Sequence, residues 1–280
     1  MSVPEAIARG AYGLRWAGVD SADLPADAPG DWPLVTVTTR VGEPVLTAAS
    51  FGGQKAEIEI APRCDLYLDR EAGSAEYVAP DELTSDELIH PYLAKSASVF
   101  AVWTGRAAIH AGAFVHRGRA WGVLGAREAG KSTLLARLAT RGVPVVADDL
   151  LVITPDLTVA MGPRCIDLRP ATVERLGSGT TIPSRRGSRG RLPLPPIEPA
   201  TPLGGWVVLD WGERAAVEPL RASDRLGNLI ARRMYGLTPA AGAGMLLDLT
   251  TLPSLRLTRP CEWGSEPAAI DLLLSALPPA

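Results

Sequence analysis

Residues 125–132, with the sequence Gly-Ala-Arg-Glu-Ala-Gly-Lys-Ser, constrain the fold of this 280-residue chain more than any other segment. They match the pattern GxxxxGK[ST], in which a glycine-containing loop wraps phosphate groups with its backbone N–H groups. The helix that follows such a loop directs its positive N-terminus at the same phosphates. Here the flanking residues predict a strand that ends at Gly125 and a helix that begins at Lys131. Because the chain has only three lysines, about 0.004 accidental matches are expected, and we interpret the segment as a phosphate-binding loop.

The loop predicts a site for a nucleoside triphosphate, ATP or GTP, together with Mg²⁺. In this motif the lysine reaches the β- and γ-phosphates and the hydroxyl residue binds the metal ion, which assigns these roles to Lys131 and Ser132. Glu128 is unusual inside such a loop, and because a carboxylate repels phosphate we expect its side chain to point outward. The predicted phosphate-binding residues are Gly125, Ala126, Arg127, Glu128, Ala129, Gly130, Lys131, Ser132 and Thr133.

Two adjacent carboxylates, Asp148 and Asp149, follow an apolar segment at 143–147 that we predict to be a strand. A phosphate-binding loop needs an acid on a neighbouring strand to hold Mg²⁺, and a hydroxyl acceptor needs a base for its proton. Two acids therefore suggest a division of labour between metal binding and proton transfer. The residues alone leave open the alternative that one aspartate only caps the next segment.

The order and spacing of these motifs resemble the catalytic core of bacterial HPr kinase/phosphorylase. His110-Ala111-Gly112 begins 15 positions before Gly125 (125 − 110), and Asp148 follows Lys131 by 17 (148 − 131), the separations expected in that family. The resemblance implies that His110 and Asp148 lie at the reaction centre, while Ser132 and Asp149 hold Mg²⁺. Taken alone, His110 would more often be a core histidine.

A second segment, Ile166-Asp167-Leu168-Arg169, is similar to a Glu-Ile-Arg segment of the same family. The similarity makes Asp167 and Arg169 candidate contacts to phosphate or substrate, although a plain surface Asp-x-Arg pair fits the sequence about as well. The resemblance as a whole covers roughly residues 107–177.

Three departures from the family pattern favour a divergent branch. Thr133 stands where an acid is expected, the loop carries Ala-Arg-Glu-Ala in place of a Ser-Gly-rich run, and no Arg-Pro-Gly-Arg-Asn type of segment follows. The chain looks like the HPr-kinase-like proteins of lasso-peptide biosynthesis, which phosphorylate the C-terminal serine of a precursor peptide. That resemblance implies an ATP-dependent kinase for a serine hydroxyl of a peptide or small protein, assembled as a homo-oligomer. Two alternatives remain: an HPr(Ser) kinase/phosphorylase of carbon regulation, and a nucleotide-gated binding module without catalysis.

The predicted fold class is α/β. The resemblance implies a P-loop kinase core of the HPr-kinase (phosphoenolpyruvate-carboxykinase-like) type over residues 89–280, after a small β-rich module over residues 1–88. Alternating hydrophobicity predicts strands in the module, and 3.6-residue periodicity predicts helices in the core. The expected strands are 34–39, 56–60, 65–68, 107–115, 120–124, 143–147 and 255–257, with a hairpin at 206–209 and 215–217, and the expected helices are 92–103, 131–141, 170–177, 223–235 and 267–277.

Residues 177–202 are rich in Gly, Ser, Pro and Arg, a composition typical of a loop without packed structure. Four arginines lie within 184–191 without an acid. One interpretation is a solvated flexible loop. The functional interpretation is a lid in which Arg185 and Arg186 bind the nucleotide or an anionic peptide, because guanidinium groups suit phosphate and carboxylate.

Overall composition limits the other classes of function. A formal net charge of −3 and a pI of about 5.7 argue against a nucleic-acid partner. Three widely spaced cysteines without a CxxC pair argue against a disulfide framework or a zinc site. The first residues have no basic and apolar signal pattern, and no apolar stretch reaches the ~18–20 residues of a membrane span. We therefore expect a cytoplasmic protein without a membrane partner.

Overall fold

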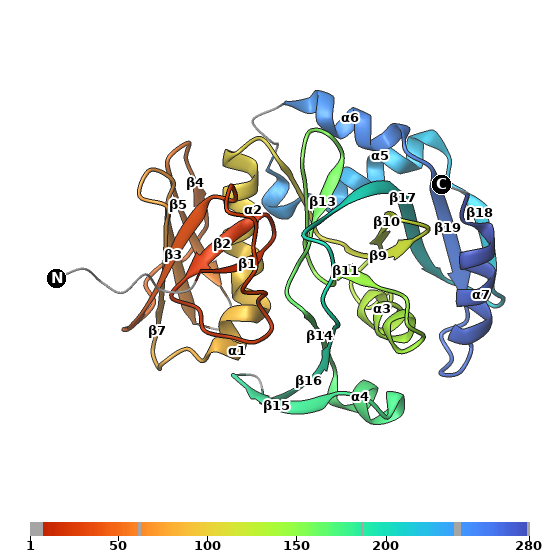
Figure 1. Ribbon diagram of the computed structural model, residues 1–280, viewed down its shortest axis with the longest axis horizontal. Coiled ribbons are helices and arrows are strands. Elements are labelled where there is room, and N and C mark those ends of the chain that lie inside the picture. Colours follow the sequence, from red (N-terminus) through yellow and green to blue (C-terminus); the bar gives the residue numbers. More distant parts are fainter. Residues whose placement is uncertain (1–7, 61–62, 186, 238–241, 279–280) are drawn as a thin grey trace.

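The computed structural model describes residues 8–60, 63–185, 187–237 and 242–278, and these residues form a mixed α/β architecture. Two large sheets and a small three-stranded sheet are present in the described part (Figure 1). None of the described helices has the length and apolar character that crossing a membrane requires.

The N-terminal sheet has seven strands in the order β1-β2-β3-β7-β6-β5-β4. The strands predicted at 34–39, 56–60 and 65–68 are confirmed as β3, β5 and β6, because alternate side chains such as Ala56, Ile58 and Ile60 are buried. The short strands β1 and β2 were not predicted. The strands are β1 (Arg9–Ala11), β2 (Leu14–Ala17), β3 (Leu34–Val41), β4 (Ser50–Phe51), β5 (Lys55–Ile60), β6 (Cys64–Asp69) and β7 (Ser74–Ala79).

Helix α2 (Leu93–Trp103) lies between the N-terminal sheet and the large sheet (Figure 1). It follows α1 (Ser85–Glu87) and an irregular turn at Leu88–Tyr92, and nine of its residues are buried. One hydrophobic core runs from the N-terminal strands through α2 to the large sheet. The division predicted after residue 88 falls inside the turn, after its first residue, and stays a prediction, since one core spans both sides.

The large sheet has nine strands, with the path β11-β9-β10-β17-β13-β12-β8 and with β19 and β18 added beside β17. Its long strand β17 pairs in parallel with β10 on one side and with β19 on the other. The strands are β8 (Ala107–Ile109), β9 (Gly112–His116), β10 (Arg119–Leu124), β11 (Val145–Ala147), β12 (Leu151–Ile153), β13 (Thr158–Ala160), β17 (Ala200–Trp211), β18 (Ala216–Pro219) and β19 (Ser254–Arg259).

Two strand predictions in this region were wrong. The expected single strand at 107–115 is divided into β8 and β9, which join different parts of the sheet, and His110 lies at the break between them. The expected hairpin at 206–209 and 215–217 is absent from the described sheet, because β18 pairs with β19 instead of β17. Local hydrophobicity marked both segments as strands, but it carries no information about which strand each one joins.

Helices α3 (Lys131–Thr140) and α7 (Glu266–Ala276) pack against one face of the large sheet. Leu134, Leu135 and Leu138 of α3 are all at most 1% exposed, which confirms the apolar face predicted for this helix. The remaining helices are α4 (Pro170–Leu176), α5 (Ala222–Ala231), a short turn η2 (Met234–Gly236) and α6 (Ala243–Thr251), of which α6 was not predicted.

The segment expected to be an unstructured loop forms most of the small sheet. Strands β15 (Thr180–Ser184) and β16 (Gly187–Pro193) make a hairpin, and β16 also pairs with β14 (Cys165–Leu168). The prediction of a mobile loop over 177–202 was therefore wrong. Its composition concealed a β-hairpin in which Gly190, Arg191 and Leu192 are buried.

Candidate functional site

A cavity of about 760 Å³ opens where several strands of the large sheet end. Strands β11, β10, β17 and β19 run in the same direction, since β9 is antiparallel to both β11 and β10. The segments that leave these strands therefore meet at one edge of the sheet. Ligands of open α/β sheets bind outside the carboxyl ends of strands, and this edge carries the sequence-predicted residues.

The loop predicted to bind phosphate connects the end of β10 to the start of α3, as expected from the flanking residues. Gly130 has φ +78°, the left-handed region that favours glycine, and it is the residue from which α3 begins. Seven of the nine predicted loop residues line the cavity: Ala126, Arg127, Glu128, Gly130, Lys131, Ser132 and Thr133. Gly125 and Ala129 are buried and do not line the cavity. An added Cβ at Gly125 would come within 2.9 Å of the Ala129 methyl group, so the loop needs glycine there.

Lys131 folds its side chain back over the loop. Its Nζ atom donates a hydrogen bond to the carbonyl oxygen of Gly125 at 3.1 Å. Burial lowers the pKa of Lys131, and the charge of Arg232 lowers it further, whereas Asp149 and Asp148 raise it. The ammonium group thus lies among the charged groups of the site.

Asp148 is a buried carboxyl group with little stabilisation of its charge. It is 9% exposed, and its Oδ1 atom has no hydrogen-bond partner among the described residues. Burial and the neighbouring charge of Asp149 raise its pKa to about 8, while the hydroxyl of Ser132 and the charge of Lys131 act to lower it. A buried oxygen without a partner beside a serine hydroxyl is a place where a cation could bind.

Asp149 has the opposite electrostatic environment. Its Oδ1 atom lies 3.2 Å from Nδ1 of His110, forming an ion pair when the imidazole is protonated. Burial acts to raise the pKa of Asp149, but the hydrogen bond from His110 and the charges of His90, His110 and Lys95 outweigh it and hold that pKa below the ordinary value. Asp149 therefore stays ionised.

These contacts pair the two aspartates differently from what the family resemblance implies. The resemblance groups Asp148 with His110 and Asp149 with Ser132. In the structure, Ser132 lies beside Asp148, and His110 pairs with Asp149. All four side chains nevertheless line the same cavity.

Asp167 and Arg169 also line the cavity, at the end of β14. Arg169 pairs with Glu128 at 2.6 Å, and both side chains are well exposed, 75% and 64% respectively. Glu128 has φ +65°, and its carboxylate is directed to Arg169 across the mouth of the loop. Asp167 is only 3% exposed and its oxygens accept hydrogen bonds from Arg189 and Arg191, so its carboxylate is occupied by protein groups.

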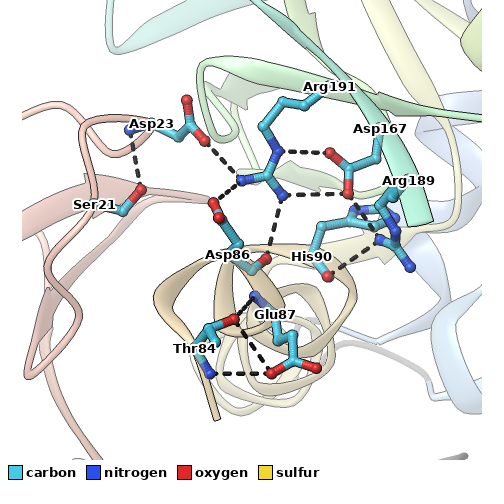
Figure 2. A network of polar contacts seen from close by, with 9 residues as sticks. All are labelled: Ser21, Asp23, Thr84, Asp86, Glu87, His90, Asp167, Arg189 and Arg191. Carbon is cyan, nitrogen blue, oxygen red and sulfur yellow. Dashed lines mark hydrogen bonds and ion pairs between the residues drawn. The ribbon is translucent and has the colours of Figure 1, made fainter. Parts of the chain in front are cut away.

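The arginines of the 184–191 segment bind protein carboxylates. Figure 2 shows Arg191 between Asp167, Asp23 and Asp86, and the Arg191–Asp23 pair measures 3.0 Å. Arg185 pairs with Asp81 and Glu87, at 3.6 and 3.2 Å. In the described structure the charge of Arg185 is therefore paired with acids that lie far earlier in the chain, and its contact with phosphate stays a prediction. Arg186, the other residue of that prediction, lies outside the described residues.

Four further residues reach the cavity from segments that the sequence did not mark. Arg232, at the end of α5, lies near Lys131, and its carbonyl oxygen accepts a hydrogen bond from the His110 backbone. Arg259 donates to the carbonyl oxygen of Ala129 at 2.6 Å. Two tryptophans, Trp211 and Trp263, also line the cavity. No sequence motif identifies these residues, since the pairing of strands and the packing of helices bring them to the loop.

The donor set can be compared with what Mg²⁺ requires. Among the described residues there is no group of three or more His, Cys, Asp or Glu side chains that could hold a metal ion. Magnesium usually keeps several waters and binds one or two carboxylates together with substrate phosphates. The free Oδ1 of Asp148 and the Ser132 hydroxyl beside it fit that pattern.

Comparisons with known proteins add a structural likeness. No model of a known protein family matches the sequence, and no curated protein matches it. Among solved structures, the Hpr(Ser) kinase/phosphatase from Coxiella burnetii is similar, with 11% identity and a TM-score of 0.32. The match covers 60% of this chain and 94% of that chain. Because both the identity and the TM-score are low, the proposals below rest on the residues of this chain.

Proposed function

We propose that this protein is a nucleotide-dependent phosphotransferase of the HPr-kinase-like type, with ATP as donor. The observation that supports this proposal most strongly is that residues of the predicted phosphate-binding loop line the same cavity as His110, Asp148 and Asp149. The first part suits a triphosphate and the second suits proton transfer and metal binding. A binding module would need the loop, but it would have no need for a paired histidine and aspartate beside it.

The loop side of the cavity would hold the phosphates. Lys131 releases the Gly125 carbonyl and bonds to the β- and γ-phosphates, and Arg232 adds a second positive charge nearby. Ser132 and Asp148 would hold Mg²⁺, whose chemistry in such sites is to neutralise charge on the phosphate oxygens. The metal role thus passes from Asp149, implied by the resemblance, to Asp148.

His110 would act as the base for the acceptor. Asp149 binds its Nδ1 atom, which leaves Nε2 free to take a proton, and the side chain is 40% exposed to the cavity. The proton of the acceptor hydroxyl passes to Nε2, and the hydroxyl oxygen bonds to the γ-phosphorus. The bond from that phosphorus to the β–γ bridging oxygen breaks, and ADP leaves.

The acceptor would be a serine hydroxyl on a peptide or small protein. The resemblance to lasso-peptide kinases supports this class, and the exposed acceptor side of the cavity at His110 is compatible with a bulky substrate. The 184–191 segment offers no support, because its described arginines Arg185, Arg189 and Arg191 are bound to protein carboxylates.

The test is mass spectrometry of serine-containing peptides after incubation with the full chain, ATP and Mg²⁺. We expect the mass increase of one phosphoryl group, and a loss of ~10²–10⁴-fold in rate for His110→Ala. The control is His116→Ala, at the far end of β9 and outside the cavity lining, which should keep the wild-type rate. Faster transfer to sugars or free amino acids would exclude the peptide acceptor. Binding of ATP without transfer to any hydroxyl would favour the nucleotide-gated module.

A further inference from the structure

Two half-exposed tryptophans form a wall of the cavity that phosphate chemistry does not explain. Trp211 is 40% exposed and Trp263 is 38% exposed, and both line the cavity with the phosphate-binding loop. Large apolar groups that remain open to solvent inside a concave site are typical of a ligand-binding surface. Neither side chain contacts His110, Asp148 or Asp149 through any aromatic or cation–π interaction in the described structure.

Strand order places this aromatic wall on the side of the loop away from the carboxylates. Asp148 and Asp149 follow β11, and β9 separates that strand from β10, which ends at the phosphate-binding loop. On the other side of β10, Trp211 ends β17, and Trp263 follows β19 by four positions (263 − 259). A triphosphate with its terminal phosphate near Asp148 would therefore extend its other end toward the tryptophans.

Guanidinium groups lie over both tryptophan rings. The guanidinium carbon of Arg259 lies 4.2 Å from the Trp211 ring centroid, and Arg259 is the register partner of Trp211 in the parallel pair β17–β19. The guanidinium carbon of Arg137 lies 4.4 Å from the Trp263 ring centroid. The guanidinium carbon of Arg175 also lies over the Trp263 ring, 5.5 Å from its centroid. Such contacts restrict the rings, and the part of each ring that stays exposed to the cavity is available for stacking.

The position of Arg137 links Trp263 to the phosphate site. Arg137 is on α3, four residues after Thr133, so both side chains lie on the same face of the helix. Thr133 is the residue after the magnesium-binding serine of the motif and lines the cavity. A nucleotide that leaves the loop along this face would meet Trp263 next.

We propose that Trp211 and Trp263 form the binding site for the purine base of the nucleoside triphosphate. A flat base stacks on aromatic rings without needing a particular hydrogen-bond pattern, and purines offer the larger face. The volume of about 760 Å³ lies within the ~300–1,000 Å³ of typical small-molecule sites. This inference rests on the proposed function, since it assigns the donor's base to the same cavity.

The test compares two ligands that share the phosphates and differ in the nucleoside. ATP and inorganic tripolyphosphate, each with Mg²⁺, are titrated by calorimetry into the full-length wild type, Trp211→Leu and Trp263→Leu. The control is Leu272→Ala, a side chain on α7 that is also 40% exposed and does not line the cavity. Circular dichroism checks folding, and the Phe variants at both positions restore an aromatic ring.

We expect each Leu variant to weaken ATP binding by roughly 10- to 100-fold, the range of base–aromatic stacking, with tripolyphosphate affinity unchanged. The Phe variants should recover most of the ATP affinity, and Leu272→Ala should match the wild type. An unchanged ATP affinity in both Leu variants overturns the base site. If the wild type binds tripolyphosphate in that case, the proposed function is still supported. An equal loss for both ligands also overturns the base site, because the tryptophans would then support only the loop. A wild type that binds neither ligand contradicts the proposed function itself.

Discussion

Replacing Asp148 with asparagine should stabilise the ligand-free protein, and the gain should depend on pH. The carboxyl group is 9% exposed, its Oδ1 lacks a partner among the described residues, and its pKa is raised from 3.8 to about 8. A raised pKa means that the folded state prefers the protonated acid. Ionisation therefore costs stability, beginning above the unfolded pKa of 3.8 and complete above the folded pKa of about 8.

The size of the effect follows from the shift. One unit of pKa corresponds to about 1.4 kcal/mol, so the full shift sets a ceiling of about 6 kcal/mol on the destabilisation by ionised Asp148. The substitution Asp148→Asn keeps the shape of the side chain and removes its charge. The free energy of unfolding of this variant should exceed that of the wild type by an amount that grows between about pH 4 and pH 8, by at most ~1.4 kcal/mol per pH unit.

The assay is urea unfolding at pH 5, 7 and 9 without nucleotide and with a chelator. The variant Asp149→Asn, at the adjacent residue, should change the free energy of unfolding in the opposite direction. The pKa of Asp149 is depressed by its hydrogen bond with His110 and by the charges of His90, His110 and Lys95, which outweigh burial, so its charge contributes stability at pH 5, where imidazoles carry a proton. That variant should be less stable than the wild type at pH 5. A wild type as stable as Asp148→Asn at pH 9, or a difference that does not vary with pH, would refute the reasoning.

Two further substitutions test the architecture around the site. Arg191→Met leaves the 3%-exposed Asp167 without its main partner and should lower the free energy of unfolding by about 3–5 kcal/mol. The exposed pair Arg40–Glu76 is the control, since Arg40→Met should cost less than ~1 kcal/mol, and equal losses in the two variants would contradict the buried network. Gly130→Ala should weaken nucleotide binding, because φ +78° disfavours a side chain and an added Cβ, 2.6 Å from Nη2 of Arg259, would disturb the hydrogen bond of that group to the Ala129 carbonyl oxygen. Gly142 has the same φ of +78° with no described atom within 4 Å of an added Cβ, so Gly142→Ala should cost stability alone. ATP affinity retained in Gly130→Ala would show that the loop does not hold the phosphates as described.

The loop between β10 and α3 and the helix that follows it were predictable because their signal is local. The glycine and lysine spacing defines the loop, and Leu134, Leu135 and Leu138 define the buried face of α3. The position of Asp148 and Asp149 at the end of a buried strand was equally predictable from the sequence. Each of these features depends on residues close to one another in the chain.

The partners of the two aspartates were not predictable from the chain alone. Adjacent residues after a strand project in different directions, and only the three-dimensional arrangement decides which one meets Ser132 and which one meets His110. The sequence therefore located the acids but could not divide their roles.

The arginine-rich hairpin was mistaken for a loop for a related reason. Its composition lacks the usual strand signal, and the acids that neutralise Arg185 and Arg191 are Asp81, Glu87, Asp23 and Asp86, far away in the chain. Trp211, Trp263, Arg232 and Arg259 were missed because pairing of strands and packing of helices, which no motif encodes, bring them to the cavity.

The most direct test of the central claim is a calorimetric titration of the full chain with Mg²⁺-ATP, compared with Lys131→Ala. Lys131 is the group placed to bond the β- and γ-phosphates, and Lys55→Ala serves as control because Lys55 is 78% exposed and does not line the cavity. We predict saturable binding to the wild type and to Lys55→Ala, and loss of binding in a folded Lys131→Ala. Absence of binding to the wild type, or equal binding by all three proteins, would contradict the assignment of residues 125–132 as a nucleotide site.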